Sequence, residues 1–140
     1  MALSVDKLTN NQQTVLDLLE NAKEPLKAYK ILFDTQKKGI KAPPQVYRAL
    51  DKLIEIGKVH KIESKNSYIA CAHKNCNSST NTSFLICELC DQVSELKQKN
   101  LTSYFAKQSE QADFKYTKHN SEIYSVCRDC TKSILKTNKI

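Results

Sequence analysis

The two CxxC pairs of this chain, Cys87 with Cys90 and Cys127 with Cys130, limit its possible folds more than any other feature. Each pair can present two thiolates from one turn of the backbone, and two such pairs complete a tetrahedral zinc site. The chain must then leave and return between the pairs, and the intervening stretch is long enough for a helix and a strand. A closed four-thiolate site is structural, and zinc there could contribute about 10–16 kcal/mol of apparent binding energy to a small domain.

Other uses of paired cysteines fit less well. A redox CxxC usually stands at the start of a helix after a strand in a thioredoxin-like unit, whereas both pairs here lie at the ends of predicted strands. Disulfides are typical of secreted proteins, and residues 1–10 lack the apolar core of a signal peptide. The chain also lacks an apolar run of about 18 residues, the length that spans a membrane. We therefore expect a cytoplasmic protein with reduced thiols.

The first half of the chain has the pattern of three helices followed by a hairpin. Thr9–Gln12 reads as a capping box before an apolar stripe, and a second helix is predicted over roughly Lys27–Lys37. Pro43 starts a third helix, which ends at Gly57. Two short strands are predicted next, at Lys58–Glu63 and Ser67–Cys71. This order is typical of a winged helix, whose last helix enters the major groove of DNA.

The remainder of the chain predicts a second, smaller α+β domain. Residues 72–82 are rich in Asn, Ser and Thr and are interpreted as a hinge linker. The predicted domains are therefore residues 1–71, a winged helix-turn-helix domain, and residues 83–140, a small α/β domain carrying the zinc site. The expected elements of the second domain are strands at Ser83–Cys87, Gln92–Leu96 and Ile123–Val126, with a helix at Leu101–Ala112.

The formal net charge of +7 permits a polyanionic partner such as DNA, although a basic solvated surface alone does not require one. No catalytic acid–base pair or nucleophile triad stands out. We therefore do not expect an enzyme.

Four stretches together resemble the ferric uptake regulator family, and its zinc uptake regulator branch in particular. They read "APPQVYRALDKLIEIGKVHKIES", "NSYIAC", "ICELCDQVSEL" and "CRDC". The resemblance implies a homodimeric, metal-dependent transcriptional repressor without a membrane segment. Its N-terminal domain would bind double-stranded operator DNA and its C-terminal domain would dimerise. It also implies a structural zinc at Cys87, Cys90, Cys127 and Cys130.

The resemblance further implies a regulatory metal at the hinge, with His60, Cys71 and Glu95 among its ligands. The fourth family ligand is usually a histidine, and Thr80 stands at that position. Cys76 or His73 of the linker could replace it, and we favour Cys76 because a thiolate is a good zinc donor. A set with two sulfurs favours zinc over iron or manganese. The expected content is about two zinc ions per chain, one structural and one regulatory.

The candidate DNA contacts lie on the helices and the hairpin of the first domain. Arg48 can bind guanine in a bidentate manner or reach a phosphate, and Tyr47 beside it can pack on a thymine methyl group. Tyr29 matches a family tyrosine that reaches bases. The family's DNA-contacting arginine is missing from the Thr9–Gln12 stretch, and Gln45 replaces a threonine. The candidate phosphate contacts are Lys41, Lys52, Lys58, Lys61 and Lys65.

These features together predict a zinc-responsive repressor of zinc uptake genes that acts as a metal-loaded homodimer. An iron-, manganese- or peroxide-sensing repressor of the same family is one alternative. A thiol oxidoreductase built on the CxxC pairs is an alternative of another class.

Overall fold

The chain divides into two compact units, Met1–Ser79 and Thr80–Ile140, in a computed structural model. The structure describes residues 7–22, 24–71, 81–96 and 99–137. Each unit is described by itself below.

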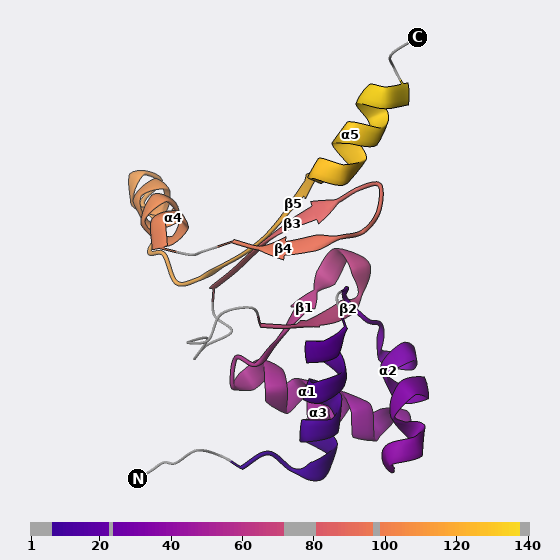
Figure 1. Cartoon of the computed structure of the whole chain (residues 1–140). Helices are drawn as coiled ribbons and strands as arrows, with labels where there is room; N and C mark the ends of the chain where they lie inside the picture. The colour runs from indigo at the N-terminus through magenta and orange to yellow at the C-terminus, as the bar shows by residue number, and fades with distance from the viewer. Residues whose placement is uncertain (1–6, 23, 72–80, 97–98, 138–140) are drawn as a thin grey trace. The chain divides into compact units, whose positions relative to one another are not determined.

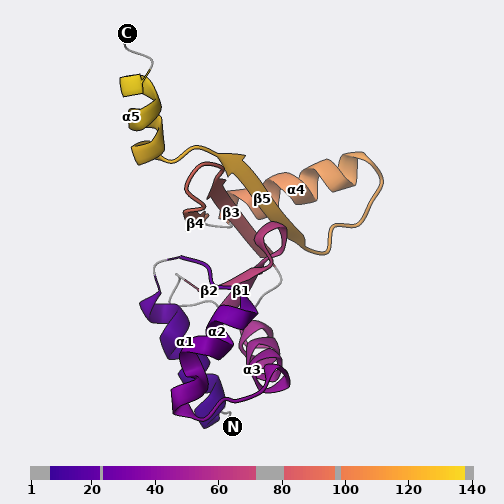
Figure 2. The same cartoon turned by 90° about the vertical axis from the view of Figure 1, so that its right-hand side faces the viewer.

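The first unit consists of three helices and a two-stranded antiparallel hairpin (Figure 1 and Figure 2). Buried apolar side chains from all three helices form its core, together with residues of the hairpin and of the segments between helices. The order of elements is that of a winged helix, as the sequence predicts. The elements are α1 (Asn10–Asn21), α2 (Ala28–Thr35), η1 (Gln36–Lys38), α3 (Pro43–Glu55), β1 (Val59–Ile62), η2 (Glu63–Lys65) and β2 (Ser67–Ala70).

The helix α3 buries one face and exposes the other. Its fully buried side chains are Val46, Ala49, Leu50 and Leu53, which follow the helical repeat of three and four residues. Tyr47 and Arg48 therefore point away from the core and are exposed. The sequence predicts both faces of this helix correctly.

The hairpin β1–β2 is tied to the helices by a short backbone bridge. His60 pairs with Ile69 across the hairpin. On its other side β2 meets Leu26, whose backbone exchanges two hydrogen bonds with Tyr68, at 2.9 and 2.8 Å. This bridge fixes the hairpin relative to the segment that precedes α2.

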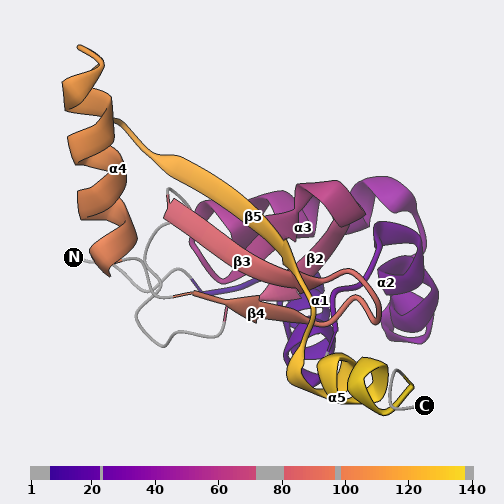
Figure 3. The same ribbon diagram turned by 90° about the horizontal axis from the view of Figure 1, so that it is seen from above.

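The second unit is a three-stranded sheet with two helices, and β3 lies between β4 and β5 (Figure 3). Strands β3 and β4 are antiparallel, whereas β3 and β5 are parallel. A parallel pair needs a crossover connection, and α4 lies within that connection. The elements are β3 (Asn81–Cys87), β4 (Val93–Glu95), α4 (Lys99–Gln111), β5 (His119–Ser125) and α5 (Arg128–Thr137).

Several predicted boundaries in the second unit are wrong. Strand β3 begins at Asn81, inside the segment that we expected to be linker, and β5 begins at His119 rather than Ile123. The helix α5 was not expected from the sequence. Residues 72–80 of the expected linker lie outside the described residues.

Two helix starts in the first unit are capped by glutamine side chains. At α1 the Oε1 atom of Gln12 accepts from the backbone N–H of Thr9 at 3.0 Å, and the Thr9 hydroxyl accepts from the Gln12 N–H at 3.2 Å. This is the predicted capping box. At α3 the Oε1 atom of Gln45 accepts from the N–H groups of Lys41 and Ala42, at 2.8 and 3.1 Å.

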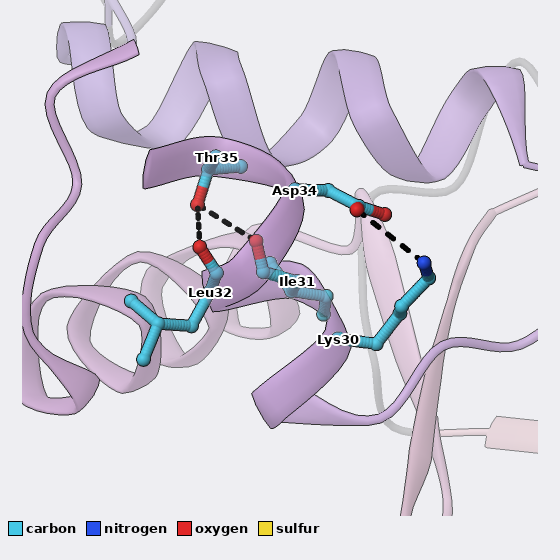
Figure 4. A network of polar contacts seen from close by, with 5 residues as sticks. All are labelled: Lys30, Ile31, Leu32, Asp34 and Thr35. Atoms are coloured by element: carbon cyan, nitrogen blue, oxygen red, sulfur yellow. Dashed lines mark hydrogen bonds and ion pairs between the residues drawn. The ribbon is translucent and has the colours of Figure 1, made fainter. Parts of the chain in front are cut away.

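The end of α2 buries a polar side chain and satisfies it locally (Figure 4). The Thr35 hydroxyl donates to the carbonyl oxygen of Ile31 at 2.7 Å, and the carbonyl of Leu32 lies 3.3 Å away. On the outer side of the same helix, Lys30 forms an ion pair with Asp34 at 3.4 Å. The α-helix ends at Thr35, two residues earlier than predicted, and the chain continues through η1, which ends at Gly39 with a φ of 101°.

Candidate metal centre and nucleic-acid interface

The four cysteines of the CxxC pairs meet because β3 and β5 are parallel and end side by side. The register pairs Cys87, the last residue of β3, with Ser125, the last residue of β5. The N–H of Glu88 donates to the carbonyl oxygen of Ser125 at 2.8 Å, which holds the two strand ends together. Cys90 follows the end of β3 within three residues and Cys127 follows the end of β5 after Val126, so both pairs lie at the same end of the sheet.

The sulfur atoms of Cys87, Cys90, Cys127 and Cys130 all lie within 4.8 Å of one another. The Sγ atoms of Cys90 and Cys127 are 3.7 Å apart. Zinc–sulfur bonds of about 2.3 Å in a regular tetrahedron place sulfur atoms about 3.8 Å apart. The spacing of the thiols therefore fits a single tetrahedral zinc ion.

The electrostatics of this cluster favour binding of a cation. The backbone N–H of Cys127 donates to the Cys87 sulfur at 3.3 Å and lowers the pKa of Cys87 to about 6. Contact with the neighbouring Cys127 thiol raises the pKa of Cys130 to about 12. Four thiolates so close together repel one another unless a positive ion lies among them. A dication bound here would keep all four in the thiolate form.

The backbone around the cluster is ordered by its own hydrogen bonds. The N–H of Asp91 donates to the carbonyl oxygen of Cys87 at 3.0 Å, and Asp91 adopts a positive φ of 64°. The N–H of Thr131 donates to the carbonyl oxygen of Cys127 at 2.9 Å, so the second pair runs directly into α5. Cys87 is 2% exposed, while Cys90 is exposed. These features suit a structural site built into the fold.

Two of the predicted regulatory ligands lie together on the hairpin. The N–H of Cys71 donates to the carbonyl oxygen of Lys58 at 2.9 Å, which continues the pairing of β1 with β2. Side chains alternate along paired strands, so His60 and Cys71 share one face as diagonal neighbours. A ring nitrogen of His60 and the sulfur of Cys71 lie within 4.8 Å.

Of the other residues considered as regulatory ligands, the structure describes Glu95 but not Cys76 or His73. Glu95 is the last residue of β4 in the second unit, opposite Phe84 of β3, and is half-buried. Cys76 and His73 lie outside the described residues.

The predicted base-contacting residues are exposed on α2 and α3. Tyr29 on α2 is 73% exposed and Tyr47 on α3 is 48% exposed. Arg48 is also exposed, and no carboxylate of the described residues forms an ion pair with it. Tyrosine and arginine side chains are among the groups that contact the phosphates of double-stranded DNA, and arginine also reaches base edges.

The predicted phosphate-contacting lysines differ in their surroundings. Lys41 and Lys58 are exposed, and Lys65 is half-buried in η2 between the hairpin strands. Lys52 lies 3.7 Å from Glu55, so part of its charge is compensated. Lys61 contacts Glu63 at 3.5 Å and also lies over the ring of Tyr68, 5.9 Å from its centroid.

A polar cluster at the start of the second-unit sheet was not predicted from the sequence. The hydroxyl of Tyr116 lies 2.6 Å from Nδ1 of His119, and the backbone N–H of His119 donates to Oδ1 of Asn81 at 3.2 Å. The ring of Phe105 on α4 lies against the imidazole, with 4.8 Å between the ring centroids. The sequence offers one signal for this cluster, the spacing of Tyr116 and His119, and that spacing does not predict the contact by itself.

Comparisons with known proteins give consistent results. Residues 5–124 match the model of the ferric uptake regulator family. The zinc uptake regulation protein of Escherichia coli (strain K12) is 31% identical over 127 residues, which cover 90% of this chain and 74% of that protein. In the described part of the chain, no helix has the length and apolar character needed to cross a membrane.

Two solved structures are also similar. The crystal structure of holo XcZur has a TM-score of 0.80 and 35% sequence identity, covering 90% of this chain and 87% of that one. A zinc uptake regulator complexed with zinc and DNA has a TM-score of 0.82 and 28% identity, covering 92% of this chain and 86% of that one.

Proposed function

The chain belongs to the ferric uptake regulator family, and from this premise we propose that it is a zinc-responsive, DNA-binding transcriptional repressor of zinc uptake genes. It acts as a metal-loaded homodimer in the cytoplasm. The similar zinc uptake regulator bound to zinc and DNA supports the proposal. The observation that carries it is the convergence of four thiols at the ends of β3 and β5, in a chain whose other unit is a winged helix.

The four cysteines of this cluster hold the structural zinc in our proposal. A closed set of four thiolates leaves zinc no position for substrate or water, so the ion stabilises the second unit and takes part in no reaction. The chain's own residues supply the thiolates and the backbone donors that orient them. The proposed total is about two zinc ions per chain.

The regulatory zinc is proposed to bind His60, Cys71, Glu95 and Cys76. The shared face of His60 and Cys71 on the hairpin supports this assignment, because both can donate to one ion once Cys71, which is disulfide-bonded in this structure, is reduced. Glu95 belongs to the second unit, so an ion bound to all of these residues would link the two units. Zinc would thereby limit the positions available to the DNA-binding unit and lower the entropic cost of binding an operator.

The proposed dimer forms through the second unit. Strand β5 is at the edge of the sheet, and an edge strand with apolar side chains is normally covered. Tyr124 is 55% exposed and Ile123 is 40% exposed on this strand. A second copy of the chain that paired with β5 would bury both of these side chains. The dimer would then carry two recognition helices, one for each of two adjacent major-groove turns of the operator.

The test measures metal content and operator binding together. The purified protein should contain about two zinc ions per chain by mass spectrometry of the metals. In a gel-shift titration, zinc should promote operator binding and a chelator should release the DNA. Tight operator binding that is unchanged by the chelator would contradict a zinc-responsive repressor.

A further inference from the structure

Cys71 is disulfide-bonded in the structure, whereas the sequence predicts a chain whose thiols are all reduced. The four cysteines of the CxxC pairs do keep free thiols, even though the Sγ atoms of Cys90 and Cys127 are only 3.7 Å apart. The disulfide therefore belongs to the end of the hairpin and not to the four-cysteine cluster. Disulfides are rare in cytoplasmic proteins, and those that form are usually transient and either catalytic or redox-sensing.

The cysteine content of the chain leaves one partner for this bond within the chain. The sequence has six cysteines, and the four of the CxxC pairs are free. The cysteine that remains besides Cys71 is Cys76, which lies outside the described residues. Our proposal therefore takes the thiol of Cys76 as the second sulfur.

The surroundings of Cys71 allow such a bond to form and to break. Its backbone N–H donates to the carbonyl oxygen of Lys58 at 2.9 Å, which fixes the residue at the end of the hairpin. Cys71 itself is half-buried, whereas His60, whose ring lies within 4.8 Å of its sulfur, is 2% exposed. The sulfur thus lies where the buried face of the hairpin meets water. Redox-sensing cysteines are typically accessible to solvent, whereas fully buried structural cysteines are inert.

Zinc and the disulfide compete for the same sulfur atom. Zinc binds the thiolate form of cysteine, and a sulfur in a disulfide is no longer a thiolate. The regulatory ion proposed above uses both Cys71 and Cys76, so the disulfide removes two of its ligands at once. The four thiols of the CxxC pairs are not affected by this bond. Oxidation would therefore empty the regulatory site and leave the structural site filled.

We propose that Cys71 is a site of reversible oxidation, at which a hydroperoxide converts the thiols of Cys71 and Cys76 into a disulfide that excludes the regulatory zinc. The proposal rests on the zinc-responsive function proposed above and adds a second input to the same site. The protein would release its operator either when zinc is scarce or when an oxidant is present.

The reaction is a two-electron oxidation of two thiols. The Cys71 thiolate attacks one oxygen of the hydroperoxide, the O–O bond breaks, and Cys71 becomes a sulfenic acid. The Cys76 thiolate then attacks the sulfur of this sulfenic acid, so that the S–S bond forms and the S–O bond breaks. The two leaving oxygens take up the protons that the thiols release and depart as an alcohol, or water, and as water. A dithiol reductant reverses the change by thiol–disulfide exchange and is itself oxidised.

Zinc binding and oxidation should oppose each other by the same factor. Because zinc binds only the reduced form, free zinc at 100 times its dissociation constant lowers the ratio of oxidised to reduced protein about 100-fold. For a two-electron couple this factor equals a rise of about 60 mV in the reduction potential of the disulfide. The structural zinc is present in both forms and does not contribute to this shift.

The experiment compares reduced, peroxide-treated and re-reduced full-length protein. Free thiols are alkylated in denaturant with a chelator, and intact mass should show six alkylated cysteines in the reduced chain and the four of the CxxC pairs in the oxidised chain. Bound zinc should fall from about two ions to about one per chain, the one that the closed four-thiolate site retains. Operator affinity in a zinc buffer should fall about 5–150-fold, the usual range of such coupling, and should return after reduction.

Two variants locate the reaction. Cys76→Ser lacks the second thiol, so peptide mapping should find no disulfide and should find oxygen added to the sulfur of Cys71. Cys71→Ser is the matched control for the oxidant, and its four CxxC cysteines should remain alkylatable after the same treatment. A redox titration of the parent with and without zinc measures the shift in potential.

The outcomes separate this inference from the proposed function. If the reduced protein fails to bind operator with zinc present, the proposed function is wrong, while alkylation and zinc content still report on the disulfide. If the reduced and oxidised proteins bind operator and zinc equally, only the redox proposal is wrong. A disulfide that joins two chains, or that joins Cys71 to a CxxC cysteine, would also overturn it. A reduction potential that zinc leaves unchanged would show that zinc and the disulfide do not compete.

Discussion

The backbone N–H of Cys127 donates a hydrogen bond to the sulfur of Cys87 at 3.3 Å. The two residues are far apart in the sequence, and the parallel register of β3 and β5 brings them together. The contact joins the first CxxC pair to the second through the backbone, in addition to the zinc ion that the four sulfurs are proposed to share. Folding of the second unit and metal binding should therefore be coupled.

Replacing Cys87 by serine should unfold the second unit. Structural zinc contributes about 10–16 kcal/mol of apparent binding energy, which is of the same size as the whole stability of a typical domain, about 5–15 kcal/mol. Circular dichroism should show loss of strand and helix signal, and sizing chromatography should show loss of the dimer. Cys71→Ser is the matched control and should retain fold and dimer. A folded Cys87→Ser dimer would rule out the structural role of this cluster.

Replacing Cys71 by serine should instead remove the response to zinc. The variant should keep the zinc of the four-cysteine cluster but lose the second ion, because it lacks the sulfur beside His60. Gel-shift titration should show weak operator binding that zinc no longer strengthens. Ile69→Val on the same strand is the control and should respond as the parent does. A normal zinc response in Cys71→Ser would refute the regulatory assignment.

The sequence predicted those parts of the fold whose residues repeat with a clear period. Val46, Ala49, Leu50 and Leu53 follow the helical repeat, so the buried face of α3 was predicted correctly. The CxxC spacing likewise indicated a cluster of four thiols, and β3 and β5 bring these thiols together. For α3 the local sequence alone carries the information, whereas for the cysteines it indicates each pair and the register of β3 and β5 brings the pairs together.

The parts that were missed depend on contacts between distant segments. The start of β5 is polar and has no apolar alternation, but the Asn81 side chain binds the backbone of His119 and extends the pairing. The helix α5 exposes Ile134 and Leu135, so it lacks the buried stripe that marks most helices. Its first turn begins directly at the second CxxC pair, where the Cys127 carbonyl accepts from Thr131.

The stability of the second unit should fall in mild acid partly because of His119. Burial lowers the pKa of its imidazole below the ordinary value of 6.5. The unfolded chain therefore binds a proton at this imidazole more readily than the folded chain does. The free energy of unfolding decreases as the pH falls below the pKa of the imidazole in the unfolded chain. Urea unfolding of the parent and His119→Gln at several pH values between about 7.5 and 5.5 spans this transition. Both chains keep the cysteines, so acid release of zinc affects them equally. The parent should have the steeper pH dependence, and equal slopes would contradict the role of His119.

Replacing Gly39 by alanine should destabilise the first unit through backbone strain alone. Gly39 has a φ of 101°, and a Cβ atom built there meets no other atom within 4 Å. The expected cost is about 1–2 kcal/mol, the penalty for a side chain in a left-handed conformation. Gly39→Asn should cost less, because asparagine tolerates this region better than alanine does. Urea denaturation of the three chains measures the difference. Equal stability of the alanine and asparagine variants would show that the turn after η1 does not need a left-handed residue.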